Sequence, residues 1–170
     1  MRTLKILFLL VLLLLGLPLL GQSEEYLIRV SISNARLDLL QDENVIATFQ
    51  VGVPKFIPKH LPIQGKITVI EKNPHWYPTK KGRELYLLRN KKELPIVVKP
   101  EDPRNAMGAA KIIIQFQNSD VNPLTRIHGT NDKESIGRKV SSGCIRMLNE
   151  DILTLIKIIE GNPTRVLFEK

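Results

Sequence analysis

Short stretches of β-branched and apolar residues alternate with turn-forming residues along most of the chain, a pattern typical of strands. These stretches predict strands at residues 26–32, 36–41, 45–53, 66–71, 111–117, 124–128 and 164–169. Asp42, Glu43 and Asn44 lie between the second and third stretches and predict the turn of a β-hairpin. The pattern therefore favours a mainly β domain.

One stretch near the end of the chain has the periodicity of a helix instead. Four apolar residues there fall at the spacing i, i+3, i+4, i+7, namely Ile152, Leu155, Ile156 and Ile159. Asn149 is the expected N-cap, and the acidic Glu150 and Asp151 suit the first turn. Gly161 and Pro163 are expected to end the helix. The predicted order is therefore one C-terminal helix followed by a short closing strand.

The connections between these elements are rich in proline. Residues 54–62 contain three prolines and are predicted as loop. Two more prolines bracket Trp76, the only tryptophan, which is presented on a loop where it either caps the core or contacts a substrate. Residues 80–105 form a long connection of the kind that often acts as a lid, with a short strand expected at residues 94–99.

The first 23 residues are expected to be a secretory signal peptide rather than part of the fold. Arg2 and Lys5 give a positive start, an apolar run follows, and Gly21 and Ser23 offer cleavage sites. A retained membrane anchor is the alternative, although the apolar run is short for a span. The domain expected after cleavage covers residues 24–170, and it is predicted to be exported to the periplasm or cell wall.

The net charge of +8 falls to +6 without Arg2 and Lys5. A basic exported protein either associates with an anionic surface or is soluble with many exposed lysines, and both interpretations stay open. Nucleic acid is not an expected partner, because aromatic residues make up only 5% of the chain and the predicted address is outside the cytoplasm.

Cys144 is the only cysteine, so no internal disulfide can form. A lone thiol in an oxidising compartment is a liability unless it does chemistry, and Cys144 follows a Ser-Ser-Gly segment rather than an apolar run. A buried, inert cysteine is the alternative. His128, sixteen residues upstream, is the candidate base that would generate the thiolate. The Gly129 carbonyl is the simplest group to orient its ring, and Gly143 suits an oxyanion-binding turn.

Metal and cofactor sites are not predicted. The candidate ligands His60, His75, His128 and Cys144 include no pair with ligand-like spacing.

Several segments together resemble the L,D-transpeptidase catalytic domain, the YkuD family of bacterial cell-wall enzymes. The strongest are His128-Gly129-Thr130, Gly137 and the run Ser-Ser-Gly-Cys-Ile-Arg-Met at residues 141–147. Residues 62–65, 73–76 and 105–108 look like further family segments, so the resemblance covers nearly all of residues 24–170. It implies a mainly β, sandwich-like domain with the catalytic pair in a cleft beneath a loop.

The resemblance also implies a reaction. The cysteine attacks a peptidoglycan tetrapeptide stem, releases the terminal D-alanine and passes the acyl group of the diamino acid at position three to an amine. That amine belongs to another stem, which gives a 3→3 cross-link, or to a lysine of a wall-linked protein; the enzyme is expected to act as a monomer. By resemblance the catalytic group is Cys144, His128 and Gly129, with Ser141, Ser142 and Gly143 shaping the oxyanion pocket and Arg146, Thr130 and Trp76 contacting substrate.

Some features leave alternatives open. Arg146 either binds a substrate carboxylate or is a structural ion-pair partner. Ser142 replaces the histidine of many family members, Leu61 replaces a threonine, and Ala106 with Met107 replaces Pro-Leu. The same site could resolve its acyl-enzyme with water, as an L,D-carboxypeptidase or an amidase. A non-catalytic wall-binding module is the third alternative.

Overall fold

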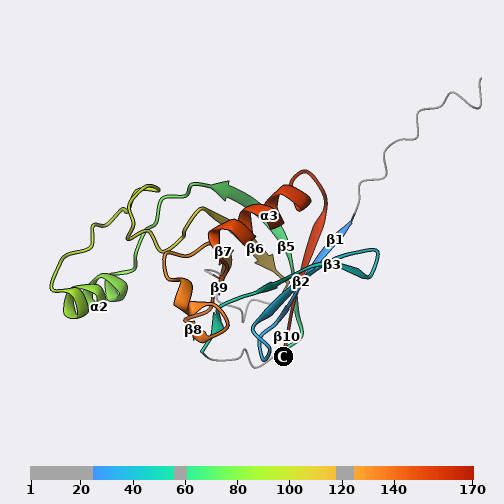
Figure 1. Cartoon of the computed structure of the whole chain (residues 1–170), viewed down its shortest axis with the longest axis horizontal. Helices are drawn as coiled ribbons and strands as arrows, with labels where there is room; N and C mark the ends of the chain where they lie inside the picture. The colour runs from blue at the N-terminus through green and yellow to red at the C-terminus, as the bar shows by residue number, and fades with distance from the viewer. Residues whose placement is uncertain (1–24, 56–60, 118–124) are drawn as a thin grey trace, which may run out of the picture.

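The computed structural model describes residues 25–55, 61–117 and 125–170, so the predicted signal peptide and His60 lie outside the described residues. An eight-stranded curled sheet dominates the fold, in the order β3-β2-β1-β10-β5-β6-β7-β9 (Figure 1). Its strands are β1 (Tyr26–Ser31), β2 (Arg36–Gln41), β3 (Asn44–Gln50), β5 (Ile63–Lys72), β6 (Ala110–Phe116), β7 (Arg126–His128), β9 (Ile145–Arg146) and β10 (Thr164–Glu169). A separate two-stranded ladder joins β4 (Val53–Pro54) to β8 (Lys139–Ser141). The mainly β class is confirmed.

The predicted hairpin is present between β2 and β3. Gln41 pairs with Asn44, and Asp42 and Glu43 both have positive φ angles, 47° and 67°. Two positive φ angles in a two-residue turn match the twist of the flanking strands, which explains why a tight turn forms here. The predicted single strand over residues 45–53 is divided, because β3 ends at Gln50 and β4 pairs elsewhere with β8.

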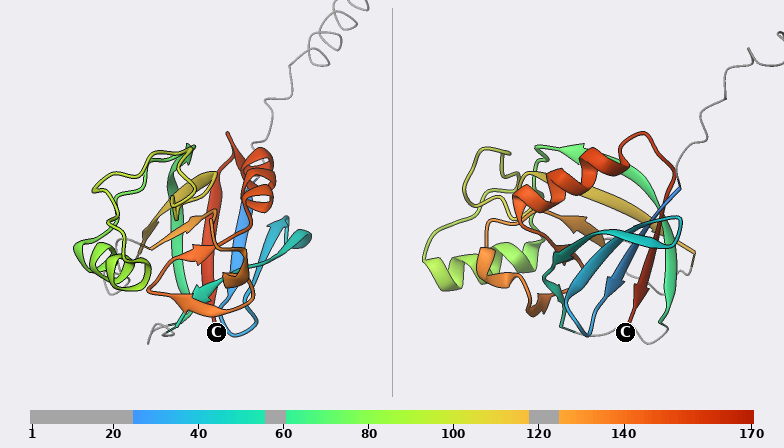
Figure 2. Two further views of the ribbon diagram at one scale, coloured as in Figure 1. Left: turned by 60° about the vertical axis from the view of Figure 1, so that its left-hand side comes forward. Right: turned by 45° about the vertical axis from the view of Figure 1, so that its right-hand side comes forward.

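The C-terminal helix α3 (Asn149–Ile159) packs on the sheet, and β10 closes the fold between β1 and β5 (Figure 2). All four residues of the predicted stripe are buried in the common core, namely Ile152, Leu155, Ile156 and Ile159. The predicted N-cap is wrong by one residue: Leu148 occupies the cap position, and Asn149 is the first helical residue. The Asn149 side chain is used outside the helix instead.

A second helix, α2 (Lys80–Asn90), begins the long connection for which no helix was predicted. Thr79 caps it by accepting a hydrogen bond from the Gly82 N–H at 3.1 Å. None of its residues is buried, so the apolar periodicity that reveals most helices is missing. The strand predicted at residues 94–99 is wrong as well, since that stretch contributes only one isolated bridge, between Val98 and Trp76. Figure 1 shows α2 standing apart from the sheet and α3.

Within the described residues, neither helix is long and apolar enough to cross a membrane.

Candidate active site

Three adjacent strands, β6, β7 and β9, build the base of the site. Ile127 in the middle of β7 pairs with Ile112 of β6 on one side and with Ile145 of β9 on the other. All three isoleucines are fully buried in the core. Because side chains alternate between the two faces of a strand, their neighbours along the chain project from the opposite face. That opposite face holds the candidate residues His128 and Arg146.

The parallel register of β7 and β9 brings two distant segments together. His128 pairs with Arg146, and Ile127 pairs with Ile145, so Arg126 and Cys144 lie level with each other one residue earlier. His128 ends β7, and Cys144 directly precedes β9, so the two residues are carried by neighbouring segments. The segments that carry the proposed base and nucleophile thus lie side by side.

The His128 imidazole is buried, with 3% of the residue exposed. Its Nδ1 lies 2.5 Å from the Gly129 carbonyl oxygen. Since a carbonyl oxygen only accepts, this contact favours the tautomer with the hydrogen on Nδ1. The ring also has a weaker backbone hydrogen bond with Ala106. Burial lowers the pKa of His128 to about 4; the bond to Gly129 opposes this shift, and the charges of Arg146 and Arg126 reinforce it. The ring is therefore a neutral proton acceptor at neutral pH.

Cys144 is half-buried and lines a cavity of about 450 Å³. Burial raises the pKa of its thiol above the ordinary value of 9.0. Hydrogen bonds from the Arg126 backbone and guanidinium, and the charges of Arg126 and Arg146, oppose that rise. At neutral pH the site thus holds a thiol and a neutral imidazole.

The loop before Cys144 is fixed by the Ser141 hydroxyl. Ser141 Oγ donates to the Cys144 carbonyl oxygen at 2.5 Å and accepts from the Gly143 N–H at 3.2 Å. The Gly143 amide, predicted as an oxyanion donor, is thus engaged inside its own loop. Ser142 is exposed and lines the cavity beside Gly143 and Cys144.

The three predicted substrate-binding residues occupy different positions. Trp76 is half-buried and lines the cavity. Arg146 pairs with Asp132, with Nη1 3.4 Å from Oδ2, and is not among the lining residues. Thr130 is buried, and its Oγ1 accepts from the Asp132 N–H at 3.0 Å, which is a contact within the loop. Among these three, only Trp76 reaches the cavity.

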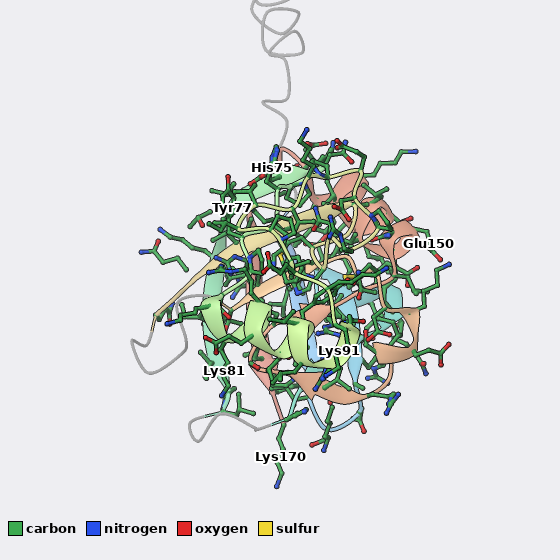
Figure 3. The ribbon with its side chains drawn as sticks, turned by 90° about the vertical axis from the view of Figure 1, so that its left-hand side faces the viewer. His75, Tyr77, Lys81, Lys91, Glu150 and Lys170 are labelled. Atoms are coloured by element: carbon green, nitrogen blue, oxygen red, sulfur yellow. The ribbon has the colours of Figure 1, made fainter. Side chains whose placement is uncertain are left out.

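Several cavity residues were not predicted from the sequence. They come from the loop before α2, from the start of α2, and from β6, β7 and the residues just before these two strands, namely His75, Tyr77, Thr79, Gly82, Met107, Lys111, Thr125 and Arg126. Figure 3 views the molecule from the side of α2, with His75 and Tyr77 labelled on the loop before the helix and Lys81 and Lys91 at its two ends. Arg126 could have been found from the sequence, because it stands two residues before His128 on a predicted strand and so shares its face.

Asn149 was also missed as part of the support for the site. Its Oδ1 accepts from the Ala109 N–H at 2.9 Å and from the Thr130 N–H at 3.1 Å. Gly129 lies so close that a Cβ built on it would be 2.3 Å from this oxygen. Asn149 therefore fastens the segment that carries the carbonyl partner of His128 to the start of α3.

The described residues contain no group of three or more His, Cys, Asp or Glu side chains arranged to hold a metal ion.

Comparison with known proteins points to one family. The profile described as YkuD, L,D-transpeptidase catalytic domain, matches residues 25–167. The chain is 37% identical over 113 residues to the probable L,D-transpeptidase ErfK/SrfK of Escherichia coli (strain K12), an alignment covering 65% of this chain and 33% of that protein. It is 30% identical over 141 residues to the putative L,D-transpeptidase YkuD of Bacillus licheniformis, which covers 83% and 64%, respectively.

Solved structures share the fold. An L,D-transpeptidase from Mycobacterium smegmatis superimposes with a TM-score of 0.57 at 13% identity, covering 86% of this chain and 59% of that one. The chain spans about a third of the length of the Escherichia coli relatives ErfK/SrfK and YbiS. The similarity therefore concerns a catalytic domain and not the whole of those proteins.

Proposed function

The chain belongs to the YkuD family of L,D-transpeptidase catalytic domains, and on that basis we propose that it is a peptidoglycan L,D-transpeptidase with Cys144 as nucleophile. The observation that carries the proposal is the parallel pairing of β7 with β9, because β7 ends at His128 and β9 begins directly after Cys144. Cys144 also lines a cavity, where a substrate could reach it. The donor is a tetrapeptide stem that ends in D-alanine.

Acylation begins with the transfer of the Cys144 thiol proton to Nε2 of His128. The sulfur attacks the carbonyl carbon of the diamino acid at position three and forms a tetrahedral oxyanion. Backbone N–H groups of the loop ending at Cys144, other than the Gly143 amide that Ser141 engages, are the proposed oxyanion donors. The C–N bond then breaks, the leaving amine takes the proton from His128, and D-alanine departs from a thioester.

The second half-reaction reverses the proton path. An acceptor amine attacks the thioester carbonyl carbon, and Nε2 of His128 takes one of its protons. The C–S bond breaks, and the sulfur recovers the proton as an amide forms. Throughout, the bond from Nδ1 to the Gly129 carbonyl holds the ring and stabilises the imidazolium that forms twice per cycle.

The acceptor decides which product appears. A second stem gives a 3→3 cross-link, a lysine of a wall-linked protein gives a wall attachment, and water gives hydrolysis. We propose the 3→3 cross-link as the main product. The protein would meet these partners after export to the periplasm or cell wall, which rests on the signal-like pattern of residues 1–23.

Tetrapeptide-containing muropeptides mixed with the purified protein test the proposal. Mass spectrometry should detect free D-alanine, an acyl adduct on the intact protein and 3→3 dimers. Cys144→Ala should abolish the adduct, and His128→Gln should slow its formation by about 10³-fold or more. Ser33→Ala, an exposed serine in the turn after β1, serves as a control that should leave turnover unchanged.

The outcomes separate the alternatives. D-alanine release with hydrolysed stems and no dimers would favour the carboxypeptidase. Release of protein from muropeptides that carry a wall-linked protein, supplied in a parallel reaction, would favour the amidase. Folded wild-type protein that binds muropeptides but forms no adduct would overturn the proposal in favour of a wall-binding module.

A further inference from the structure

We propose that Arg126 forms a carboxylate-binding subsite beside Cys144 that holds the free α-carboxylate of the residue released from the donor stem. The inference rests on the proposed function and names the substrate group that the site selects.

The position of Arg126 follows from the sheet. It precedes Ile127 in β7 as Cys144 precedes Ile145 in β9, and these two isoleucines pair in parallel register. Arg126 and Cys144 both line the cavity. Hydrogen bonds from the Arg126 backbone and guanidinium to Cys144 lower the pKa of the thiol against the effect of burial. The guanidinium is thus within hydrogen-bonding reach of the sulfur that would attack the substrate.

The geometry of the donor fits this arrangement. In the leaving residue, the carboxylate carbon is three bonds from the scissile carbonyl carbon, through the amide nitrogen and the Cα. A sulfur poised at that carbonyl therefore has the carboxylate close beside it. The five donors of a guanidinium can contact the sulfur region and still present a fork to a carboxylate.

The charge of the cavity favours an anionic ligand. Its lining residues include the cations Lys111 and Arg126 and no carboxylate. Two nearby carboxylates lie outside the lining and are paired. Glu71 accepts from Lys111 at 2.7 Å, and Asp132 pairs with Arg146. Of the two lining cations, Arg126 is the one whose hydrogen bonds and charge act on the Cys144 thiol.

A matched pair of donors tests the subsite. One is the tetrapeptide stem with a free C-terminal carboxylate, and the other is the same stem as its C-terminal carboxamide. Both give the identical acyl-enzyme on Cys144, so any difference in its rate of formation arises from the leaving residue, and the part that Arg126→Gln removes reports recognition by the guanidinium. Intact-protein mass spectrometry of the full chain measures that rate for each donor.

The wild type should acylate from the free acid about 10–100-fold faster, the range expected for a charge-assisted hydrogen-bonded pair. Arg126→Gln should bring the ratio of the two acylation rates near one, mainly by slowing acylation from the free-acid donor. Arg126→Lys should keep part of the preference, because lysine retains the charge but lacks the paired donors of the guanidinium. Arg138→Gln, an exposed arginine, is the control and should keep the wild-type ratio.

The contrary outcomes are distinct. If Arg126→Gln slows both donors equally and shifts the pH profile of Cys144 alkylation, Arg126 only tunes the thiol and the subsite is overturned. If the wild type acylates from both donors at equal rates, the subsite is overturned. This comparison needs no variant, so it decides the question even if Arg126→Gln does not fold. If neither donor acylates the wild type, it is the proposed function that fails.

Discussion

Replacing Asn149 with alanine should weaken both the fold and the proposed catalysis, because one oxygen supports the segment around His128. Oδ1 of Asn149 accepts two backbone N–H groups, from Ala109 and Thr130, at 2.9 and 3.1 Å. Asn149→Ala leaves both donors without this acceptor. Each buried donor that loses its partner costs about 1–3 kcal/mol.

The expected loss of unfolding free energy is about 2–4 kcal/mol, towards the lower part of the summed range, because Asn149 is half-buried and water can replace some of the lost bonding. That is a large share of the roughly 5–15 kcal/mol that stabilises a typical domain. Thr130 follows Gly129, whose carbonyl accepts from His128. Loosening this segment should therefore reduce acylation by more than the unfolded fraction accounts for.

Asn149→Asp distinguishes this account from a general disturbance of α3, since it keeps an acceptor at Oδ1 and places a negative charge in the first turn of the helix. It should stay within about 1 kcal/mol of the wild type and retain acylation. Glu150→Ala, an exposed change in the same turn, is the control. Urea unfolding and the rate of acyl-enzyme formation supply the two measurements. Equal damage from the alanine and aspartate variants would refute the reasoning.

Three other predictions follow from the same region and from α2. Gly129→Ala should destabilise the fold by about 2–4 kcal/mol in urea unfolding, since its Cβ would lie 2.3 Å from the Asn149 oxygen; wild-type stability would show that the loop shifts freely. The pKa of His128 is about 4 in the folded protein and 6.5 ordinarily. Its contribution to the free energy of unfolding should therefore be fully present above pH 6.5 and should fall by about 3 kcal/mol as the pH is lowered towards 4. His128→Gln should flatten that part of the pH–stability curve, and an unchanged slope would contradict the assignment. Thr79→Ala should speed hydrogen exchange within α2 but leave global unfolding within about 0.5 kcal/mol, because no residue of α2 is buried; a large global loss would show that α2 is integral to the core.

The elements predicted correctly are those whose signal is local. The stripe in α3 and the strand β10 follow from side chains that alternate between water and the core, which the order of residues records directly. The turn at Asp42 and Glu43 is likewise decided by neighbouring residues. The helix α2 escaped because none of its residues is buried, so its apolar residues follow no period.

The supporting contacts of the site could not be predicted, because they join segments far apart in the sequence. Asn149 is a residue type that often caps helices. Only the folded chain shows that its side-chain oxygen accepts hydrogen bonds from backbone N–H groups 19 and 40 residues away. The same holds for the Arg146–Asp132 pair, since composition alone left a substrate contact and an ion pair equally open.

The pairing of Cys144 with His128 depends on residues that take no part in the chemistry. A slip of one residue between β7 and β9 would turn the sulfur or the imidazole towards the core and an isoleucine towards the cavity. Such a slip is opposed by the burial of Ile127 and Ile145, each worth about 1.5–3 kcal/mol. The burial of these two isoleucines therefore also keeps the segments that carry the proposed nucleophile and base side by side, so the core and the site are determined by the same register.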